Sequence, residues 1–402
     1  MTRRTIATAV AALAVLVPAS ASGGRLDAAG DVRMLVAELE RQHPDPYHAV
    51  SRENFRHAAD DLAARAVGLR RDQLVVGVMR LMALLGERDG HSGVHPLSPG
   101  QNLRAYPLRL YRFPEGFFVA RALDPSLIGA RVTAIGGVPM EEVEARVRPL
   151  ITRDNEWTVL DRLPFFVVVA EVLGGLDIAP VFSFELADGN RRDVGIEPIS
   201  VALHIQRFGG WWQPTVRPGK QPLYLRLRNR AYALSRIDRG RALYVTYNST
   251  THPRGVPSRL IHLARSKRVR RVIVDVRLNG GGDNTTYNRL IEALRHRRIN
   301  HARKLRVLIG RRTFSAAGNF AGDVDRFTRA RFVGEPTGGA PSQWGDSAQI
   351  PLPSLGITVS TAVMYIGSPE DTRVATHPDA PVATSAADFF AGRDPVLAAA
   401  LR

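Results

Sequence analysis

The sequence predicts an α/β protein in which a helical segment and a β-rich module precede a domain of alternating strands and helices. Its 402 residues are enough for two or three domains. Apolar residues make up 45% and charged residues 23% of the chain, which excludes bulk disorder. From Ala242 to Val333, strand-like and helix-like segments follow one another in turn. Such an alternation predicts a mainly parallel sheet covered by helices.

The first part of the chain is predicted to be helical. Apolar residues recur at helical spacing between Val32 and Leu39, and residues 73–85 are apolar on most faces, as in a buried helix. We assign residues 27–97 to a helical N-terminal domain, which contains the polar, glycine-rich turn 86–93 near its end.

Residues 98–200 are predicted to form a β-rich module, because the apolar period changes there towards two. Within it, the stretch GARVTAIGGVPMEEV at 129–143 resembles a segment of a PDZ domain. Prolines at 214, 218 and 222 then mark a linker at 201–222. We assign residues 223–402 to the α/β domain.

The N-terminus has the pattern of a secretory signal peptide. Arg3 and Arg4 precede an apolar run at 6–17, and small residues follow at 19–21. This run is short for a membrane-spanning helix. We predict cleavage after Ala21, with an uncleaved signal anchor as the alternative, and therefore a protein that is secreted or located in the cell envelope.

Composition and charge narrow the classes of chemistry and partner. The chain has no Cys, which excludes disulfides, thiolate metal sites and a cysteine nucleophile. It also has no H-E-x-x-H motif, which argues against a zinc hydrolase. The formal net charge is +17 at pH 7, but the basic clusters lack interleaved aromatic residues. We therefore expect no nucleic-acid partner and interpret the charge as a solvated surface or as loose attraction to an anionic envelope surface.

A glycine-rich loop, DVRLNGGGDN at 275–284, follows one of the apolar strands of the α/β domain. Consecutive glycines at 280–282 let main-chain N–H groups approach a developing anion. A phosphate-binding loop is excluded, because Asp283 and Asn284 stand where the Walker pattern needs Lys and Ser or Thr. A tight turn with no chemical role is the structural alternative.

A second loop, TFSAAGNF at 313–320, places Ser315 between a strand and a helix, with small residues directly behind it. A hydroxyl at such a turn is exposed at the edge of the sheet, and the N–H group of Ala316 points to where an oxyanion would lie. A simple helix N-cap is the alternative role for Ser315. Thr313 replaces the first glycine of G-x-S-x-G, so the motif differs from the nucleophile elbow of α/β-hydrolases.

Taken together, these motifs resemble the tail-specific, or C-terminal processing, serine peptidases in the broad sense, including tricorn-core relatives. The resemblance rests on DVRLNGGGDN, TFSAAGNFA, GEPTGG at 334–339 and GRDPVLAAAL at 392–401, and it extends upstream to RDGHSGV at 88–94. It implies a crotonase/ClpP-like αββ serine peptidase domain at 223–402, a PDZ-like module and helical N-terminal parts. It also implies that the protein uses neither a metal nor an organic cofactor.

The scarcity of lysine bears on the catalytic arrangement. Ser-Lys members of the family carry their lysine downstream of the nucleophile, where this chain has Ala340, and no lysine follows Lys304. Arginine cannot replace it as a base, because its pKa above about 12 keeps it protonated. The resemblance to tricorn-type members implies His91 as the base instead. One departure is Gly90, because tricorn-type members have a serine before the catalytic histidine.

The resemblance also implies the groups around this pair. The oxyanion would be held by the N–H groups of Ala316 and of Gly281 or Gly282. Asp371 lies at the distance downstream of Ser315 that suits the acid partner of His91, with Glu370 and Asp346 as alternatives. We therefore predict a secreted serine peptidase that hydrolyses peptide bonds of peptides or polypeptide tails. A catalytically inactive ligand- or peptide-binding homologue on the same scaffold is the alternative.

Overall fold

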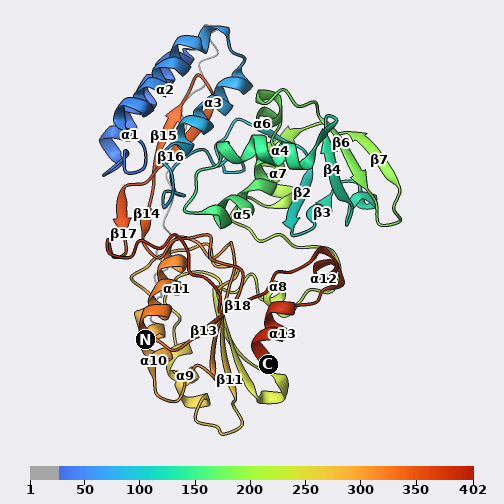
Figure 1. Cartoon of the computed structure of the whole chain (residues 1–402). Coiled ribbons are helices and arrows are strands. Elements are labelled where there is room, and N and C mark those ends of the chain that lie inside the picture. Colours follow the sequence, from blue (N-terminus) through green and yellow to red (C-terminus); the bar gives the residue numbers. More distant parts are fainter. Residues whose placement is uncertain (1–26) are drawn as a thin grey trace, which may run out of the picture.

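The second half of the chain is built around a six-stranded sheet with helices on both faces (Figure 1). The computed structural model describes residues 27–402, so the signal peptide expected at 1–21 lies outside the described residues. The strand order is β18-β13-β12-β11-β10-β9, and only the edge pair β9 and β10 is antiparallel. The predicted α/β class is confirmed. The strands are β9 (Tyr232–Ile237), β10 (Ala242–Tyr247), β11 (Arg271–Asp275), β12 (Leu305–Ile309), β13 (Arg331–Gly334) and β18 (Ala380–Pro381).

Alternate residues of the central strands pack against different helices. Leu243, Val245 and Tyr247 of β10 share a core with the helices on one face, and Ala242 and Tyr244 share a core with those on the other. Because β10, β11 and β12 are parallel, the loops that follow them meet at one edge of the sheet. The helices are α9 (Val256–Leu263), α10 (Asn288–Arg295) and α11 (Ala316–Phe327) on the first face, and α8 (Leu223–Arg226) and α13 (Pro395–Leu401) on the second.

An antiparallel sheet of order β2-β3-β4-β6-β7 forms the β-rich module, with the short strand β5 paired to β4. Helices α4 and α5 contact β4 and β2 of this sheet, respectively. The elements are β2 (Leu108–Phe113), β3 (Gly116–Ala122), β4 (Arg131–Ile135), β5 (Val138–Pro139), α4 (Met140–Val147), α5 (Glu156–Phe166), α6 (Ala170–Gly175), β6 (Val181–Glu185) and β7 (Arg191–Gly195), with β1 (Arg104–Ala105) and β8 (Ile199–Ser200) paired beside them.

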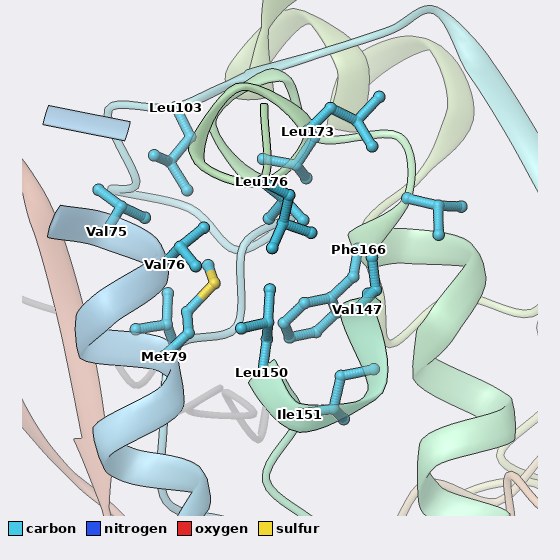
Figure 2. Packing of buried hydrophobic residues seen from close by; sticks show 14 of the residues in the cluster. Val75, Val76, Met79, Leu103, Val147, Leu150, Ile151, Phe166, Leu173 and Leu176 are labelled. Atoms are coloured by element: carbon cyan, nitrogen blue, oxygen red, sulfur yellow. The ribbon is translucent and has the colours of Figure 1, made fainter. Parts of the chain in front are cut away.

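The N-terminal helices share their core with this module. Figure 2 shows Val76 and Met79 of α3 directed towards Leu150, Phe166 and Leu176 of the module. All of these side chains are nearly or fully buried, so the N-terminal helices and the module bury apolar surface against each other. The helices are α1 (Ala28–Gln42), α2 (Arg52–Arg65) and α3 (Arg71–Ala83). Within residues 27–402, no helix of the protein is long and apolar enough to cross a bilayer.

One part of the domain assigned to 223–402 packs with the N-terminal half of the chain. The hairpin β15–β16 buries Ile350 and Leu352 in the core that contains α1 and α3, and it lies beside these helices in Figure 1. The main-chain N–H group of Leu355 donates to the buried carboxylate of Asp31 on α1, at 3.1 Å. The strands of this excursion are β14 (Gln343–Gly345), β15 (Ala348–Leu352), β16 (Ile357–Thr361) and β17 (Met364–Ile366).

The stretch expected to be a linker is anchored instead. It begins with helix α7 (Val201–Phe208), and the irregular chain that follows is held by Arg109. The guanidinium of Arg109 is fully buried and donates to the carbonyl oxygens of Gly209, Gly210 and Gln213. A buried cation has to find hydrogen-bond acceptors, and here the acceptors are the backbone of residues about a hundred positions later in the chain. The prolines do not reveal such a distant partner.

Candidate active site

Ser315 lies at the sharp turn between β12 and α11. Its backbone has φ 56° and ψ −133°, a conformation that residues other than glycine rarely adopt. Its side chain makes no capping hydrogen bond to the helix, so the N-cap role considered from the sequence is not the one it has in this structure. The turn is attached to the end of the neighbouring strand β11, because the hydroxyl of Thr313 donates to the carbonyl oxygen of Val276 at 2.9 Å. Such a strained, well-supported turn directs the Ser315 side chain away from the helix.

The imidazole of His91 meets the hydroxyl of Ser315. The distance between His91 Nε2 and Ser315 Oγ is 2.9 Å, although 224 residues separate the two along the chain. The His91 ring also stacks on Phe314, with ring centroids 4.8 Å apart and an interplanar angle of 28°. The structure therefore brings together the two residues that the sequence motifs predicted to react with each other.

Burial and a neighbouring cation favour the neutral form of His91. Desolvation, followed by the positive charge of Arg162, lowers the pKa of His91 to about 4. Arg162 is itself buried, and burial lowers its own pKa to about 10. A neutral imidazole at hydrogen-bond distance from a hydroxyl can accept its proton across the physiological pH range.

The glycine loop approaches Ser315 so closely that no side chain fits between them. A Cβ atom on Gly281 would lie 2.6 Å from Ser315 Cβ, and Gly281 has φ +117°. The N–H group of Gly281 donates to Asn279 Oδ1 at 2.9 Å, so it is already used. Within residues 27–402, the N–H groups of Gly282 and Ala316 have no hydrogen-bond partner. Of the two glycines considered for the oxyanion site, the hydrogen bonds favour Gly282 over Gly281.

Asn279 connects the glycine loop to the turn of Ser315. The fully buried side-chain amide of Asn279 donates to the carbonyl oxygen of Tyr247 at 2.9 Å. The main-chain carbonyl oxygen of Asn279 accepts the N–H group of Phe314 at 3.1 Å. With its acceptance from Gly281, Asn279 links the ends of β10, β11 and β12. These bonds hold the glycine loop against the turn that carries Ser315.

Asp154 fixes the backbone that carries His91. Its carboxylate accepts the N–H group of Gly90 at 2.7 Å and that of Ala340 at 3.0 Å. Burial raises the pKa of Asp154 to about 7, against the opposing effect of these hydrogen bonds and of Arg162. A Cβ atom on Gly90 would lie 2.9 Å from Asp154 Oδ1 and 3.0 Å from the Phe314 ring. The departure at Gly90 therefore has a physical reason, since the space for a side chain is already filled.

The excursion β14–β17 supports the same loop on both sides of His91. The N–H group of Trp344 donates to the carbonyl oxygen of Arg88 at 2.8 Å. On the other side, Gly93 and Ser360 exchange two main-chain hydrogen bonds, at 2.8 and 2.9 Å. The loop at 88–93 is thus held by main-chain hydrogen bonds to a region that lies far away in the sequence.

The structure does not place the predicted acid beside His91. The carboxylate of Asp371 pairs with Arg373 at 2.7 Å, and this hydrogen bonding lowers the pKa of Asp371. Glu370 is exposed. Asp346, also exposed, is near enough for its charge to raise the pKa of His91 slightly. Of the three acids named from the sequence, only Asp346 acts electrostatically on His91 in this structure.

The second nitrogen of His91 has a main-chain neighbour. Nδ1 is buried, and its interaction with the carbonyl of Trp344 raises the pKa of the ring without reaching the geometry of a full hydrogen bond. Distance along the chain suggested Asp371, but the bidentate guanidinium of Arg373 holds that carboxylate elsewhere. The assignment of Asp371 as the partner of His91 is therefore not supported by the geometry.

One group of side chains has the composition of a metal site. Ligand atoms of His43, His48 and Asp89 lie within 4.8 Å of one another. His43 Nδ1 accepts the N–H group of Asp45, so its Nε2 carries the proton and faces Asp89 Oδ2 at 3.2 Å. The nitrogens of His48 face the carbonyl oxygens of Asp45 and Glu87 at 2.9 and 3.3 Å. The backbone therefore occupies His48 and one nitrogen of His43, whereas His43 Nε2 and Asp89 Oδ2 have no hydrogen-bond partner within residues 27–402.

No sequence motif identifies Asp154 or Arg162 as neighbours of the candidate site. Both act through space, on residues 64 to 186 positions away, and neither belongs to a motif with characteristic spacing. The one local signal is polar: Asp154 precedes Asn155, which caps α5 with its side chain. That signal predicts a helix start and nothing about the candidate site.

Comparison with known proteins places this geometry on a known fold. No family model and no curated protein matches the sequence. Among solved structures, a CPAF mutant has a TM-score of 0.61 at 13% identity, over 91% of this chain and 94% of its own. Mature CPAF complexed with lactacystin has a TM-score of 0.58 at 12% identity, over 91% and 95%. The tricorn protease is more distant, with a TM-score of 0.36 at 14% identity, over 93% of this chain and 36% of its own. The chain therefore has the fold of CPAF over nearly its whole length.

Proposed function

We propose that this protein is a serine peptidase that hydrolyses peptide bonds through Ser315 and His91. The observation that carries the proposal is the 2.9 Å contact between His91 Nε2 and Ser315 Oγ, in which the histidine pKa is lowered to about 4. The fold supports it, because structures that resemble this chain include serine peptidases such as CPAF. Peptides or polypeptide tails are the proposed substrates.

The reaction follows from the positions of these groups. His91 Nε2 accepts the proton of the Ser315 hydroxyl while Oγ forms a bond to the carbonyl carbon of the scissile peptide. The oxyanion accepts hydrogen bonds from the N–H groups of Gly282 and Ala316. The intermediate then collapses, the carbon–nitrogen bond breaks, and the proton passes from His91 to the leaving amine. A water molecule repeats the sequence on the acyl-enzyme, which releases the acid product and restores the Ser315 hydroxyl.

A fluorophosphonate probe tests this proposal directly. The probe forms a bond between its phosphorus and Ser315 Oγ, the phosphorus–fluorine bond breaks, fluoride leaves, and His91 takes the serine proton. We expect the wild-type protein to be labelled and Ser315→Ala and His91→Ala to remain unlabelled. Labelling of either variant at the wild-type rate would overturn the assignment. A folded protein that neither reacts with the probe nor cleaves a peptide library would favour the inactive binding homologue instead.

We propose in addition that the protein acts outside the cytoplasm and that its finer architecture follows the family. Export is supported by the charged, apolar and small-residue pattern at 1–21. A PDZ-like character of the module is supported by residues 129–143, which include β4, β5 and the start of α4 in that order. Attraction to an anionic envelope surface would follow from the net charge, which is +17 for the full chain and 17 − 2 = +15 once Arg3 and Arg4 are removed with the signal peptide. N-terminal sequencing of the exported protein tests the first point, and retention of residues 1–21 would contradict cleavage after Ala21.

A further inference from the structure

We propose that a cavity beside the glycine loop binds a carboxylate side chain of the substrate, which gives the proposed peptidase a preference for acidic residues near the cleaved bond. The inference rests on the proposed function for its consequence, but the binding itself can be measured without turnover. It is built from the position of the cavity, its distance from Ser315 and the charges around it.

The cavity has a volume of about 510 Å³ and lies between two loops at the carboxyl edge of the large sheet. One loop follows β10 and contributes His252 and Arg254, and the other follows β11 and contributes Thr285. The start of α10 closes one side with Arg289. This volume is large enough for the side chain and adjoining backbone of one or two residues.

The two loops are joined to each other by hydrogen bonds at the part of the glycine loop that contacts Ser315. Thr250 donates its N–H group to the carbonyl oxygen of Gly281 at 2.8 Å and accepts the N–H group of Asp283 at 2.8 Å. Gly281 in turn touches Ser315, since a Cβ atom there would lie 2.6 Å from Ser315 Cβ. The turn of Ser315 therefore lies beside the glycine loop, and the glycine loop lies beside the loop after β10. The cavity opens where the glycine loop and the loop after β10 separate.

The distance to the cavity fixes which substrate residue would enter it. Consecutive Cα atoms are about 3.8 Å apart, so Thr285 lies within about 15 Å of Gly281. An extended peptide advances about 3.4 Å per residue. A side chain in the cavity therefore belongs to a residue within roughly four positions of the scissile bond, if the substrate runs extended across the glycine loop.

The charged side chains that line the cavity are of one sign, although the exposed carboxylate of Asp283 lies near enough to His252 to interact with it. Arg254, Arg289 and His252 are exposed at its rim, and no Asp or Glu lines it. The nearest acid in the sequence, Asp283, uses its carboxylate to accept the N–H and hydroxyl groups of Thr285, at 2.9 and 2.7 Å. Two guanidinium groups without a carboxylate among the lining residues offer a forked set of donors that suits a carboxylate ligand.

Cleavage profiling tests the preference in the context of turnover. A peptide library with blocked termini is digested, and we expect Asp and Glu to be enriched at one position within about four residues of the cleaved bond, on one side of it. In a matched pair of peptides, Glu should be cleaved about five times faster than Gln at that position, as expected for partly exposed ion pairs. The double variant Arg254→Ala/Arg289→Ala should cleave both peptides equally. Arg259→Ala, which changes an exposed residue of α9 that does not line the cavity, should keep the preference.

Binding to Ser315→Ala separates the subsite from catalysis. A fluorescein-labelled decapeptide rich in Glu and its Gln counterpart, both with amidated C-termini, are titrated at low salt. We expect the Glu probe to bind about fivefold more tightly and the difference to vanish in the Arg254→Ala/Arg289→Ala background. Equal binding of both probes, or an undiminished preference in that background, would overturn the proposal. If versions of both probes with free C-termini bind equally well, and more tightly than the amidated probes, the cavity binds the terminal carboxylate rather than a side chain. Cleavage without any acidic preference would contradict the proposed subsite alone. Selective binding of the Glu probe without cleavage by the wild-type protein would contradict the proposed peptidase function alone.

Discussion

The carboxylate of Asp154 occupies the space next to Gly90 in which any other residue would place its side chain. Asp154 Oδ1 accepts the Gly90 N–H group at 2.7 Å, and a Cβ atom at Gly90 would approach the same oxygen to 2.9 Å. The glycine before His91 and the buried acid are therefore one structural unit. Asp154 acts as a positioning residue, because it touches the backbone that carries His91 and not the reacting atoms.

Substitution of Gly90 by Ala should slow the reaction of Ser315. The added Cβ atom must displace the Asp154 carboxylate or the Phe314 ring, which moves His91 relative to the serine. We expect fluorophosphonate labelling to slow by at least about tenfold, since small displacements of catalytic groups have large effects on rate. Gly195→Ala is the control, because nothing lies within 4 Å of its Cβ position. Wild-type labelling by Gly90→Ala at an unchanged melting temperature would show that the close approach has no catalytic consequence.

Labelling should persist to an unusually low pH. Because the pKa of His91 is lowered to about 4, its neutral, basic form is present throughout the range from pH 5 to 8. The rate should fall on the acid side near pH 4 rather than near the ordinary histidine value of about 6.5. A rate measured against pH checks this, provided that circular dichroism shows the protein folded at each point. A half-loss of rate near pH 6.5 would contradict the lowered pKa.

The pKa shifts of His91 and Asp154 have opposite effects on how the stability of the fold depends on pH. The folded-state pKa of His91 lies below its unfolded value, so the stabilisation from neutral His91 declines as the pH falls from 6.5 towards 4. The pKa of Asp154 is raised from 3.8 to about 7, so its protonated form favours folding, and this contribution declines as the pH rises from 3.8 towards 7. The two contributions partly cancel, and we expect a weak dependence of the melting temperature on pH between 4 and 6.5 from this pair.

Removal of the buried charge at Arg162 should raise the pKa of His91. Arg162→Gln takes away the cation that, after desolvation, does most to disfavour the imidazolium form. The acid limb of the labelling profile should move upward by about one pH unit. Arg162→Lys keeps a cation at the position and should leave the limb near its wild-type place. If both variants show the same limb, the charge of Arg162 does not act on His91.

Substitutions of the acids distinguish between the two regions considered for the partner of His91. Asp371→Asn should leave the labelling rate within about twofold of wild type, because that side chain is engaged by Arg373. Asp346→Asn should shift the acid limb slightly downward, since the Asp346 charge raises the pKa of His91. Glu370→Gln serves as the control beside Asp371. A loss of labelling confined to Asp371→Asn would restore that residue as the acid partner.

The sequence predicted the parts of the site that are carried by local motifs. Ser315 and the glycines at 280–282 each follow an apolar strand at the edge of a parallel sheet, where such loops are brought together. His91 came from the resemblance, and its contact with Ser315 joins segments 224 residues apart. Asp371 was chosen by distance along the chain, which contains no information about Arg373.

The boundaries between structural parts were harder to predict than the elements themselves. Strands and helices of the α/β domain follow from apolar periodicity, and most lie within a few residues of their expected positions. The excursion at 343–366 could not be foreseen, because its short strands are covered by helices from the opposite end of the chain. The stretch at 209–222 similarly depends on Arg109, a charged residue whose burial no local pattern announces.

The hydrogen bonds from Trp344 and Ser360 to the loop of His91 can form only late in the synthesis of the chain. During synthesis the histidine leaves the ribosome more than two hundred residues before the serine, and the segment that holds its loop in place emerges later still. A growing or truncated chain that stops before residue 344 contains both reactive side chains but lacks the supports on either side of the histidine. Such a chain is therefore expected to react with the fluorophosphonate probe more slowly than the full-length protein.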